Sequence, residues 1–310
     1  MAETGAIGIR DVTKRFGTFT AVDALSLDVP TGSIYGFIGP NGSGKTTTIR
    51  MIMNILLPDQ GEITVLGEHS TRAARDKVGY LPEERGLYRK MHVRRLLRYY
   101  GALKGTPAST MEREIDFWLA RFDLTAWRDA KIETLSKGMS QKVQFIATVI
   151  SRPELVILDE PFSGLDPVNA DVMRDAVLEL RRRGTTIVFS THDMAVAERM
   201  CDRLFMIFKG RKMLDGTLDS IQAAYGFDTI RVRSSGGHAV LEGLPDVISI
   251  VDHGNLQEVR VSGDPQAFLQ RLVVRTAVQH FEVTRPSLHD IFVRIAKPEA
   301  EPADILPVGR

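Results

Sequence analysis

The sequence predicts an α/β fold followed by a smaller α+β domain, and three observations support this. Short apolar runs at Ile34–Ile38 and Leu155–Leu158 have the length of strands that are buried on both faces of a parallel sheet. Residues 84 to 150, between these runs, are rich in helix formers, which indicates an inserted helical subdomain. Beyond Gly226 the composition changes and strand-like alternation begins, which indicates a separate domain.

The composition is that of an ordinary globular protein. With 310 residues, of which 43% are hydrophobic and 25% charged, the chain can bury a sizeable core in one large or two moderate domains. The formal net charge of +1 provides no basic field, so we expect no nucleic-acid partner. No apolar run approaches the roughly 18 residues of a membrane span, and the first residues lack a signal-peptide pattern.

Cysteine usage points to a reducing compartment. Cys201 is the single cysteine, so no internal disulfide is possible and a cytoplasmic location is expected. A reactive thiol at this position is the less favoured interpretation. A small buried apolar residue is the favoured one.

Residues 39 to 46 fit the phosphate-binding pattern G-x-x-x-x-G-K-[ST] at every position. The glycines let the backbone turn tightly and direct its N–H groups inward, and a helix is expected from Thr46 to Leu57. The positive end of that helix then faces the phosphates, Lys45 can reach the outer two, and the Thr46 hydroxyl can ligate magnesium. The alternative is a chance glycine-rich turn, which the flanking strand and helix disfavour. The expected nucleotide contacts are Gly39, Pro40, Asn41, Gly42, Ser43, Gly44, Lys45, Thr46 and Thr47.

A second candidate site lies where the apolar run Leu155–Leu158 ends in Asp159 and Glu160. In doubly wound sheets ligands collect at the carboxyl ends of strands, which places both acids beside the phosphate loop. Asp159 can hold hydrated magnesium, whereas Glu160 can orient and polarise the attacking water. For an isolated acid pair, a strand end facing solvent is the better interpretation. The upstream phosphate loop reverses that preference.

These motifs together resemble those of ABC-type ATPases. Leu135–Gln141 is similar to the signature motif of that family, Ser163–Pro167 to its D-loop, and Thr191-His192 falls where its switch histidine lies. The resemblance covers residues 8 to about 220. It implies a phosphate-loop NTPase core of the ABC ATPase type that hydrolyses ATP with Mg²⁺.

The resemblance also implies that two ATPase subunits share each nucleotide. In the family, the signature Ser136 and Gly138 and the D-loop Asp166 complete the site of the opposite subunit. Since a single phosphate loop occurs here, we expect a second ATPase subunit, with a homodimer as the simplest case. His192 resembles the residue that senses the γ-phosphate and links it to Glu160. Without this context, His192 would be an ordinary strand-end histidine.

Four positions bear on how closely the chain follows the family. Lys137 and Met139 replace the usual glycine and glutamine of the signature. Glu83 occupies the place of a glutamine that touches magnesium and water; a carboxylate can still ligate the metal but cannot donate amide hydrogen bonds. Phe16 lies where an aromatic ring stacks on adenine. The alternative for Phe16 is a core residue of an early strand.

Apolar and basic residues are interleaved from Leu87 to Tyr100. In the family this surface of the helical subdomain receives the transmembrane subunit. By composition alone, a solvated basic helix face is the favoured interpretation. The family context favours the docking surface.

The C-terminal region predicts a small split βαβ, ferredoxin-like domain. Asp264-Pro265 predicts one helix start, and Ser287 with Asp290 approximates a capping box before a second helix. Arg285–Phe292 also resembles the C-terminal appendix of ATPase subunits from sodium, drug and polysaccharide exporters. Three segments are predicted as further strands: 247–252, 257–262 and 278–284.

The sequence thus predicts an ATPase domain at residues 1–225, an appendix domain at 226–296 and a disordered tail at 297–310. The expected function is the cytoplasmic ATPase subunit of an ABC transporter of the export type. It would attach to the inner face of the membrane through a separately encoded permease. Two alternatives remain open, a soluble ABC-type ATPase that acts on ribosomes or nucleic acid, and a non-catalytic nucleotide sensor. Nothing in the sequence indicates the transported substrate.

Overall fold

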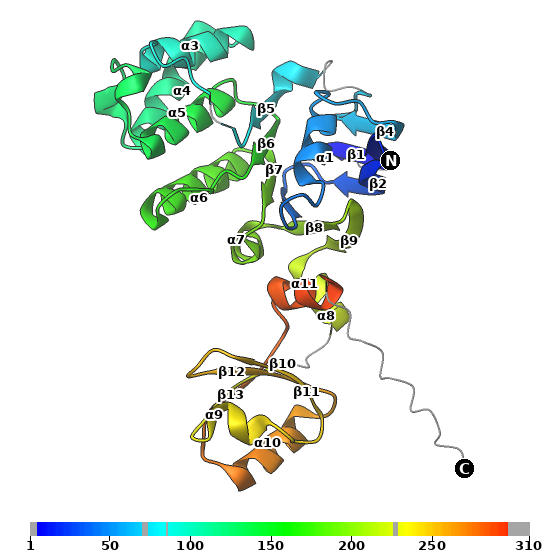
Figure 1. Cartoon of the computed structure of the whole chain (residues 1–310). Coiled ribbons are helices and arrows are strands. Elements are labelled where there is room, and N and C mark those ends of the chain that lie inside the picture. The colour runs from blue at the N-terminus through cyan, green and yellow to red at the C-terminus, as the bar shows by residue number, and fades with distance from the viewer. Residues whose placement is uncertain (1–4, 70–73, 85, 226–228, 297–310) are drawn as a thin grey trace. The chain divides into compact units, whose positions relative to one another are not determined.

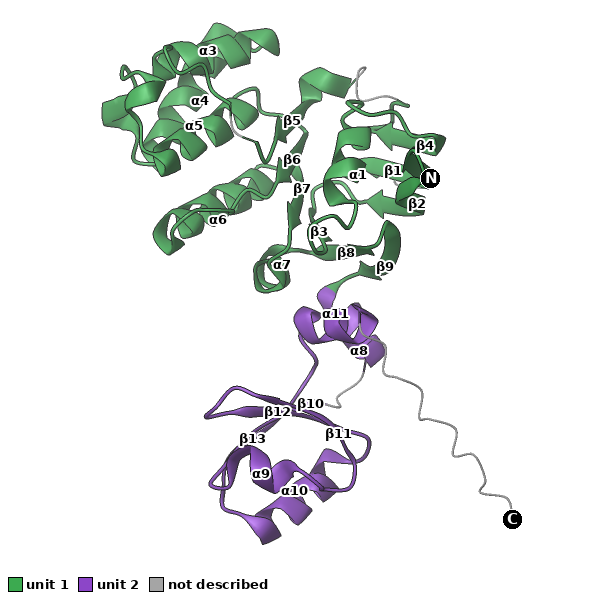
Figure 2. Cartoon of the chain, viewed as in Figure 1, with its two compact units in different colours: residues 1–217 green, residues 218–310 purple. Residues whose placement is uncertain are grey.

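The computed structural model describes residues 5–69, 74–84, 86–225 and 229–296, and the chain divides into two compact units, residues 1–217 and 218–310 (Figure 2). The sequence analysis placed this boundary eight residues later, after Tyr225. The difference is helix α8 (Leu218–Tyr225), which packs against α11 (Leu288–Ala296) of the second unit. Gln222 Nε2 on α8 donates to the carbonyl oxygen of Pro286 at 2.9 Å. The tail predicted at 297–310 lies outside the described residues.

The first unit contains a sheet with the strand order β5-β6-β7-β3-β8-β9 (Figure 1). Neighbouring strands are parallel except β8 and β9. Every residue of β3 and β6 is buried, as the continuous apolar runs predict. The carboxyl ends of the parallel strands therefore meet at one edge. The strands are β3 (Ile34–Ile38), β5 (Val78–Leu81), β6 (Leu155–Asp159), β7 (Thr186–Thr191), β8 (Arg203–Phe208) and β9 (Arg211–Gly216).

An antiparallel sheet with the order β2-β1-β4 lies beside helix α1 (Lys45–Ile52). Its strands are β1 (Ile7–Phe16), β2 (Phe19–Val29) and β4 (Gln60–Val65). Helix α1 is shorter than the predicted Thr46–Leu57. Asn54 adopts a left-handed φ of 54°, and the backbone N–H groups of Ile55 and Leu56 turn back to the carbonyl of Arg50.

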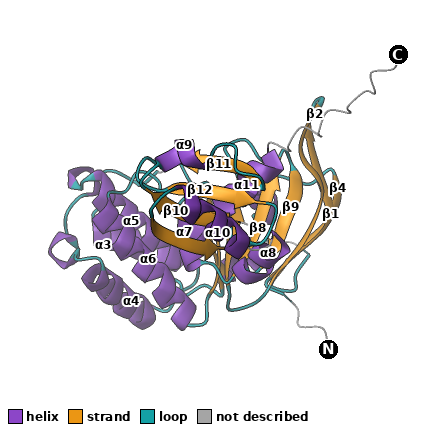
Figure 3. Cartoon of the chain, turned by 90° about the horizontal axis from the view of Figure 1, so that it is seen from below, coloured by secondary structure: helices purple, strands orange, loops and turns teal. Residues whose placement is uncertain are grey.

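Helices α3 (Val93–Leu103), α4 (Ala108–Arg121) and α5 (Lys137–Val149) form the helical subdomain. Figure 3 shows these helices and α6 (Pro167–Arg182) gathered on one side of the first unit and β1, β2 and β4 at the other. The described helices also include α7 (Met194–Met200) and the short 3-10 turns Arg75–Lys77, Thr125–Trp127 and Ile132–Thr134. Among the residues that the structure describes, no helix has the length and apolar character needed to span a membrane.

Two arginines of the basic surface predicted at Leu87–Tyr100 bind a glutamate inside the helical subdomain. Arg94 on α3 donates to Glu112 of α4 from Nε at 3.1 Å and from Nη2 at 2.6 Å. Arg98 binds the other oxygen of the same carboxylate. These guanidinium groups hold the pKa of Glu112 below its usual range. Arg95, in contrast, is exposed on α3.

The second unit has the order β-α-β-β-α-β that the sequence predicts, with strand order β11-β12-β10-β13 and antiparallel pairing throughout. Helices α9 and α10 cover one face, and Ile230, Val259 and Phe268 meet in the core. The predicted caps are present: Asp264 accepts from the backbone of α10, and Ser287 and Asp290 form a reciprocal capping box. The elements are β10 (Thr229–Ser234), α9 (Gly237–Leu241), β11 (Val247–Asp252), β12 (Gln257–Val261), α10 (Pro265–Arg275) and β13 (Val278–Thr284).

Trp118 is the largest fully buried side chain of the helical subdomain among the described residues, where it packs with Phe122 and Phe145. Replacing Trp118 with Ala removes this ring from a closed core, so we expect a loss of about 3–5 kcal/mol in stability. Trp127→Ala is the matched control, because Trp127 is 39% exposed and should cost less than about 1 kcal/mol. Urea unfolding followed by circular dichroism measures both. Equal midpoints for the two variants would contradict this account of the core.

Candidate nucleotide site

The phosphate loop leads from β3 into the first turn of α1. Gly39 has φ 152°, and a Cβ there would lie 2.3 Å from the carbonyl oxygen of Ile207, so only glycine fits. Gly44 precedes α1 with φ 115° and provides no side-chain cap. The N–H groups of the first turn are therefore available to an anion at the positive end of the helix.

The Lys45 ammonium lies within the curve of the loop. Its Nζ donates to the carbonyl oxygens of Gly39 at 2.7 Å and Pro40 at 3.2 Å. Burial lowers the pKa of Lys45, while the negative charges of Glu160, Asp159 and Glu83 act in the opposite sense. Two carbonyl oxygens of the loop thus hold the lysine in place.

Glu160 connects the phosphate loop to the end of β7. Its Oε1 lies 3.9 Å from Lys45 Nζ and 3.1 Å from His192 Nδ1. The residue is buried and adopts a left-handed φ of 50°, which turns the chain sharply as it leaves β6. Burial raises the pKa of the Glu160 carboxyl, and the hydrogen bond with His192 opposes that rise. Lys45, Glu160 and His192, which the sequence analysis placed in one site, are brought together.

Ser190 on β7 is a site residue that sequence reasoning missed. Its Oγ donates to Asp159 Oδ1 and accepts the backbone N–H of Glu160 at 3.0 Å. One hydroxyl therefore fixes both acids. The other oxygen of Asp159, Oδ2, is buried and has no hydrogen-bond partner among the described residues. A buried carboxylate oxygen without a partner is costly unless a ligand or cation satisfies it.

Three further residues of the predicted site lie in α1 or just beyond β5, namely Thr46, Thr47 and Glu83. The two threonines are half-buried in the first turn of α1, and Glu83 is exposed just beyond β5. Since β5 is parallel to its neighbour β6, its carboxyl end lies at the same edge of the sheet as Asp159. The charge of Glu83 reaches Lys45.

Phe16 ends β1 with its side chain largely in solvent. The residue is 48% exposed, and Lys14 Nζ lies 5.6 Å from the centre of its ring. The interpretation of Phe16 as a core residue is therefore wrong. An exposed ring face is available for stacking.

The signature and D-loop residues form a separate cluster. Ser136 caps α5 by accepting from Met139 N at 3.2 Å, and Asp166 caps α6 by accepting from Asn169 N at 3.0 Å. Asn169, which sequence reasoning did not single out, also lies beside Gly138. Within the described part of the chain, neither Ser136 nor Asp166 is hydrogen-bonded to the phosphate loop.

The comparisons with known proteins agree with this geometry. Residues 22–163 match the family described as ABC transporter, and residues 216–296 match the ATP-binding protein DrrA1-3-like C-terminal domain. An uncharacterized ABC transporter ATP-binding protein of Bacillus subtilis, YhaQ, is 40% identical over 92% of this chain and 96% of its own length. The Nod factor export ATP-binding protein I of Burkholderia lata is 34% identical over 95% of this chain and 98% of its own.

A solved structure described as the ATP binding subunit of an ABC transporter is similar with a TM-score of 0.67 and 31% identity, covering 71% of this chain and 93% of that one. The chain thus shares its fold, over 71% of its length, with an ATP binding subunit of an ABC transporter. The identity of whole-length relatives extends the agreement to both units. The chain therefore belongs to the ATP-binding subunits of ABC transporters, the family that hydrolyses ATP to power transport.

Proposed function

We propose that this chain is the ATPase subunit of an ABC exporter, working as a homodimer on a separately encoded permease at the cytoplasmic face of the membrane. The observation that carries the proposal is the convergence of Lys45, Glu160 and His192 beside the phosphate loop. The export named for the Burkholderia lata relative supports the direction of transport.

The loop and α1 bind the triphosphate of ATP. Backbone N–H groups of residues 41–47 donate to the phosphate oxygens, and Lys45 exchanges its carbonyl partners for the outer phosphates. Phe16 stacks on the adenine through its exposed ring.

The residues at this edge fit a magnesium ion. Mg²⁺ prefers hard oxygen ligands, and Asp159 Oδ2 is a buried carboxylate oxygen without a hydrogen-bond partner among the described residues. Ser190 holds Oδ1 and so orients Oδ2. Thr46 would add a hydroxyl and Glu83 a further carboxylate to such a site. When bound, the ion would neutralise charge on the phosphates.

Glu160 accepts the proton of the attacking water. His192 holds its carboxylate, and the Ser190 hydroxyl accepts its backbone N–H. His192 stays partly exposed, so it can contact the γ-phosphate while it holds Glu160. Charge that develops on the γ-phosphate is then met by Lys45.

A second copy completes the site. Ser136 and Gly138 stand at the start of α5, a helix of 13 residues whose N-terminal N–H groups form an anion site. In a head-to-tail dimer, the cluster of each copy faces the phosphate loop of the other. ATP thereby draws the copies together, and hydrolysis releases them.

Glu160→Gln should bind ATP normally but hydrolyse it at least about 100-fold more slowly, because the amide cannot accept the proton. Phosphate release and nucleotide binding measure the two properties separately. Glu154→Gln is the matched control, since Glu154 is an exposed acid just before the same strand. Full turnover in Glu160→Gln would exclude the base assignment. Absence of turnover in the wild-type dimer would favour a nucleotide sensor.

Ser136→Arg should abolish ATP-driven dimerisation. The long arginine side chain would occupy the space at the start of α5 that the phosphate needs. The substitution is made in the Glu160→Gln background, which retains ATP, and sedimentation velocity measures the dimer. Ser109→Arg, an exposed serine in the first turn of α4, is the control and should dimerise. Dimers that form equally well in both variants would argue against the signature contact.

Arg95→Glu should weaken assembly with the permease while leaving ATP binding intact. Arg95 is the better probe of this surface than Arg94, whose substitution would break the contacts with Glu112. Arg113→Glu, an exposed arginine of α4 in the same subdomain, is the control. The measurement is the yield of the membrane protein that co-purifies with tagged chain from solubilised membranes. Equal yields for both variants would remove Arg95 from the docking surface.

A further inference from the structure

Gln141 of α5 is a buried amide beside the two acids of the nucleotide site. The residue is 4% exposed, and its Nε2 donates to the backbone carbonyl oxygen of Ser163 at 3.3 Å. That contact fixes the orientation of the amide, because a carbonyl oxygen can only accept. The amide oxygen, Oε1, is buried and has no hydrogen-bond partner among the described residues. A buried acceptor in this state costs free energy unless a further donor reaches it.

Gln141 lines a small cavity together with Asp159 and Glu160. The cavity has a volume of about 10 Å³, and Leu81 at the end of β5 and Met173 of α6 are among the apolar residues that close it. A cavity needs roughly 10–15 Å³ to hold one water molecule. This cavity therefore has room for a single water and for no larger ligand.

The polar atoms of the lining match the hydrogen-bonding groups of one water molecule. Asp159 is 2% exposed, and its Oδ2 is the second buried oxygen of the lining without a partner in the part of the chain that the structure describes. Asp159 Oδ2 and Gln141 Oε1 cannot satisfy each other, because both are acceptors. A water molecule can donate one hydrogen to each. The amide of Gln144, also in the lining, can donate to the water oxygen, which gives the three bonds typical of a buried water.

Gln141 lies where two parts of the site meet. It belongs to α5, the helix that begins at the signature motif, and it contacts Ser163 in the D-loop. The backbone N–H of Ser163 in turn donates to the carbonyl oxygen of Glu160 at 3.2 Å. A water on Gln141 Oε1 would add a contact with Asp159. One side chain would then join the signature helix and the D-loop to both acids.

We propose that one buried water molecule joins Gln141 Oε1 to Asp159 Oδ2, and that Gln141 is thereby a positioning residue for ATP hydrolysis. The Asp159 carboxylate is then held at both oxygens, by Ser190 at Oδ1 and by the water at Oδ2. Since a carboxylate oxygen has two lone pairs, Oδ2 can accept from this water and still face a metal ion.

The positioning role deepens the proposed function and rests on it. In the head-to-tail dimer, the signature helix and the D-loop of one copy serve the nucleotide of the other copy, whereas Asp159 and Glu160 serve their own. Gln141 is therefore a polar connection between the two nucleotide sites.

A crystal structure of the full-length chain, at a resolution that shows ordered waters, tests the water directly. We expect density for one water within hydrogen-bond distance of Gln141 Oε1 and Asp159 Oδ2. A cavity without density, or a Gln141 Oε1 that binds a protein group, would overturn the proposal. This measurement depends neither on hydrolysis nor on the folding of a variant.

Gln141→Met tests the positioning role, because it keeps the length of the side chain and removes the amide. We expect a kcat for ATP hydrolysis about tenfold below that of wild type, as the loss of a hydrogen bond to a charged group predicts. The Kd for ATP should be unchanged, since the phosphate loop and Phe16 are intact. Gln60→Met, at an exposed glutamine of β4, is the control and should hydrolyse ATP as wild type does.

A double-mutant cycle with Ser190→Ala separates positioning from a general loss of structure. Both side chains hold Asp159, so their effects on kcat should not multiply in the double variant. Circular dichroism melting verifies that each variant is folded. Effects that do multiply, or full kcat in Gln141→Met, would overturn the positioning role. Absence of turnover in the wild type would contradict the proposed function and with it this role, while the water is still judged from its density.

Discussion

The site depends on the parallel register of β6, β7 and β3. Ile38 pairs with Thr191, and Asp159 with Ser190, so the phosphate loop, both acids and His192 leave the sheet at the same level. A slip of one residue would turn Ser190 to the other face and remove its hydrogen bonds to Asp159 and Glu160. Because every residue of β3, β6 and β7 is buried, such a slip would also disrupt close packing on both faces of the sheet.

The parts of the site that sequence could predict are those whose chemistry is local. The loop from Gly39 to Thr46 and the acids after Leu158 can each be recognised from a short run of consecutive residues. Ser190 does not, because its role arises only when β7 pairs with β6. The same limit applies to α1, whose last turn is decided by the left-handed conformation of Asn54 rather than by helix propensity.

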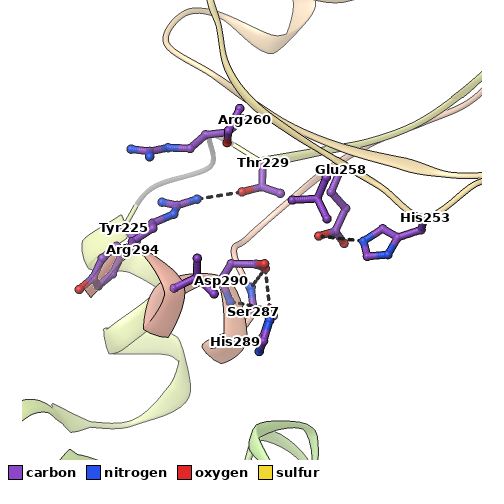
Figure 4. A pocket seen from close by; sticks show the side chains of 12 residues that line it. Tyr225, Thr229, His253, Glu258, Arg260, Ser287, His289, Asp290 and Arg294 are labelled. Atoms are coloured by element: carbon purple, nitrogen blue, oxygen red, sulfur yellow. Dashed lines mark hydrogen bonds and ion pairs between the residues drawn. The ribbon is translucent and has the colours of Figure 1, made fainter. Parts of the chain in front are cut away.

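In the second unit, local capping and alternation predicted the strands and helices α10 and α11, but not α8 or α9. Asp264, Ser287 and Asp290 cap helices where the sequence placed them. A cavity of about 690 Å³ in this unit, lined by Tyr225, Thr229 and Arg294 among others, was not predictable in this way (Figure 4). It requires the polar face of β10 and β12 to stand opposite one side of α11, and sequence periodicity identifies faces without showing which of them meet.

The contact between α8 and α11 brings together the first and last helices of the second unit that the structure describes. These helices flank the sheet in sequence, and Arg285, just before α11, binds Asp219 of α8 at 2.8 Å, as Gln222 binds Pro286. Entry and exit of the module therefore lie side by side, the arrangement that tolerates circular permutation and domain insertion.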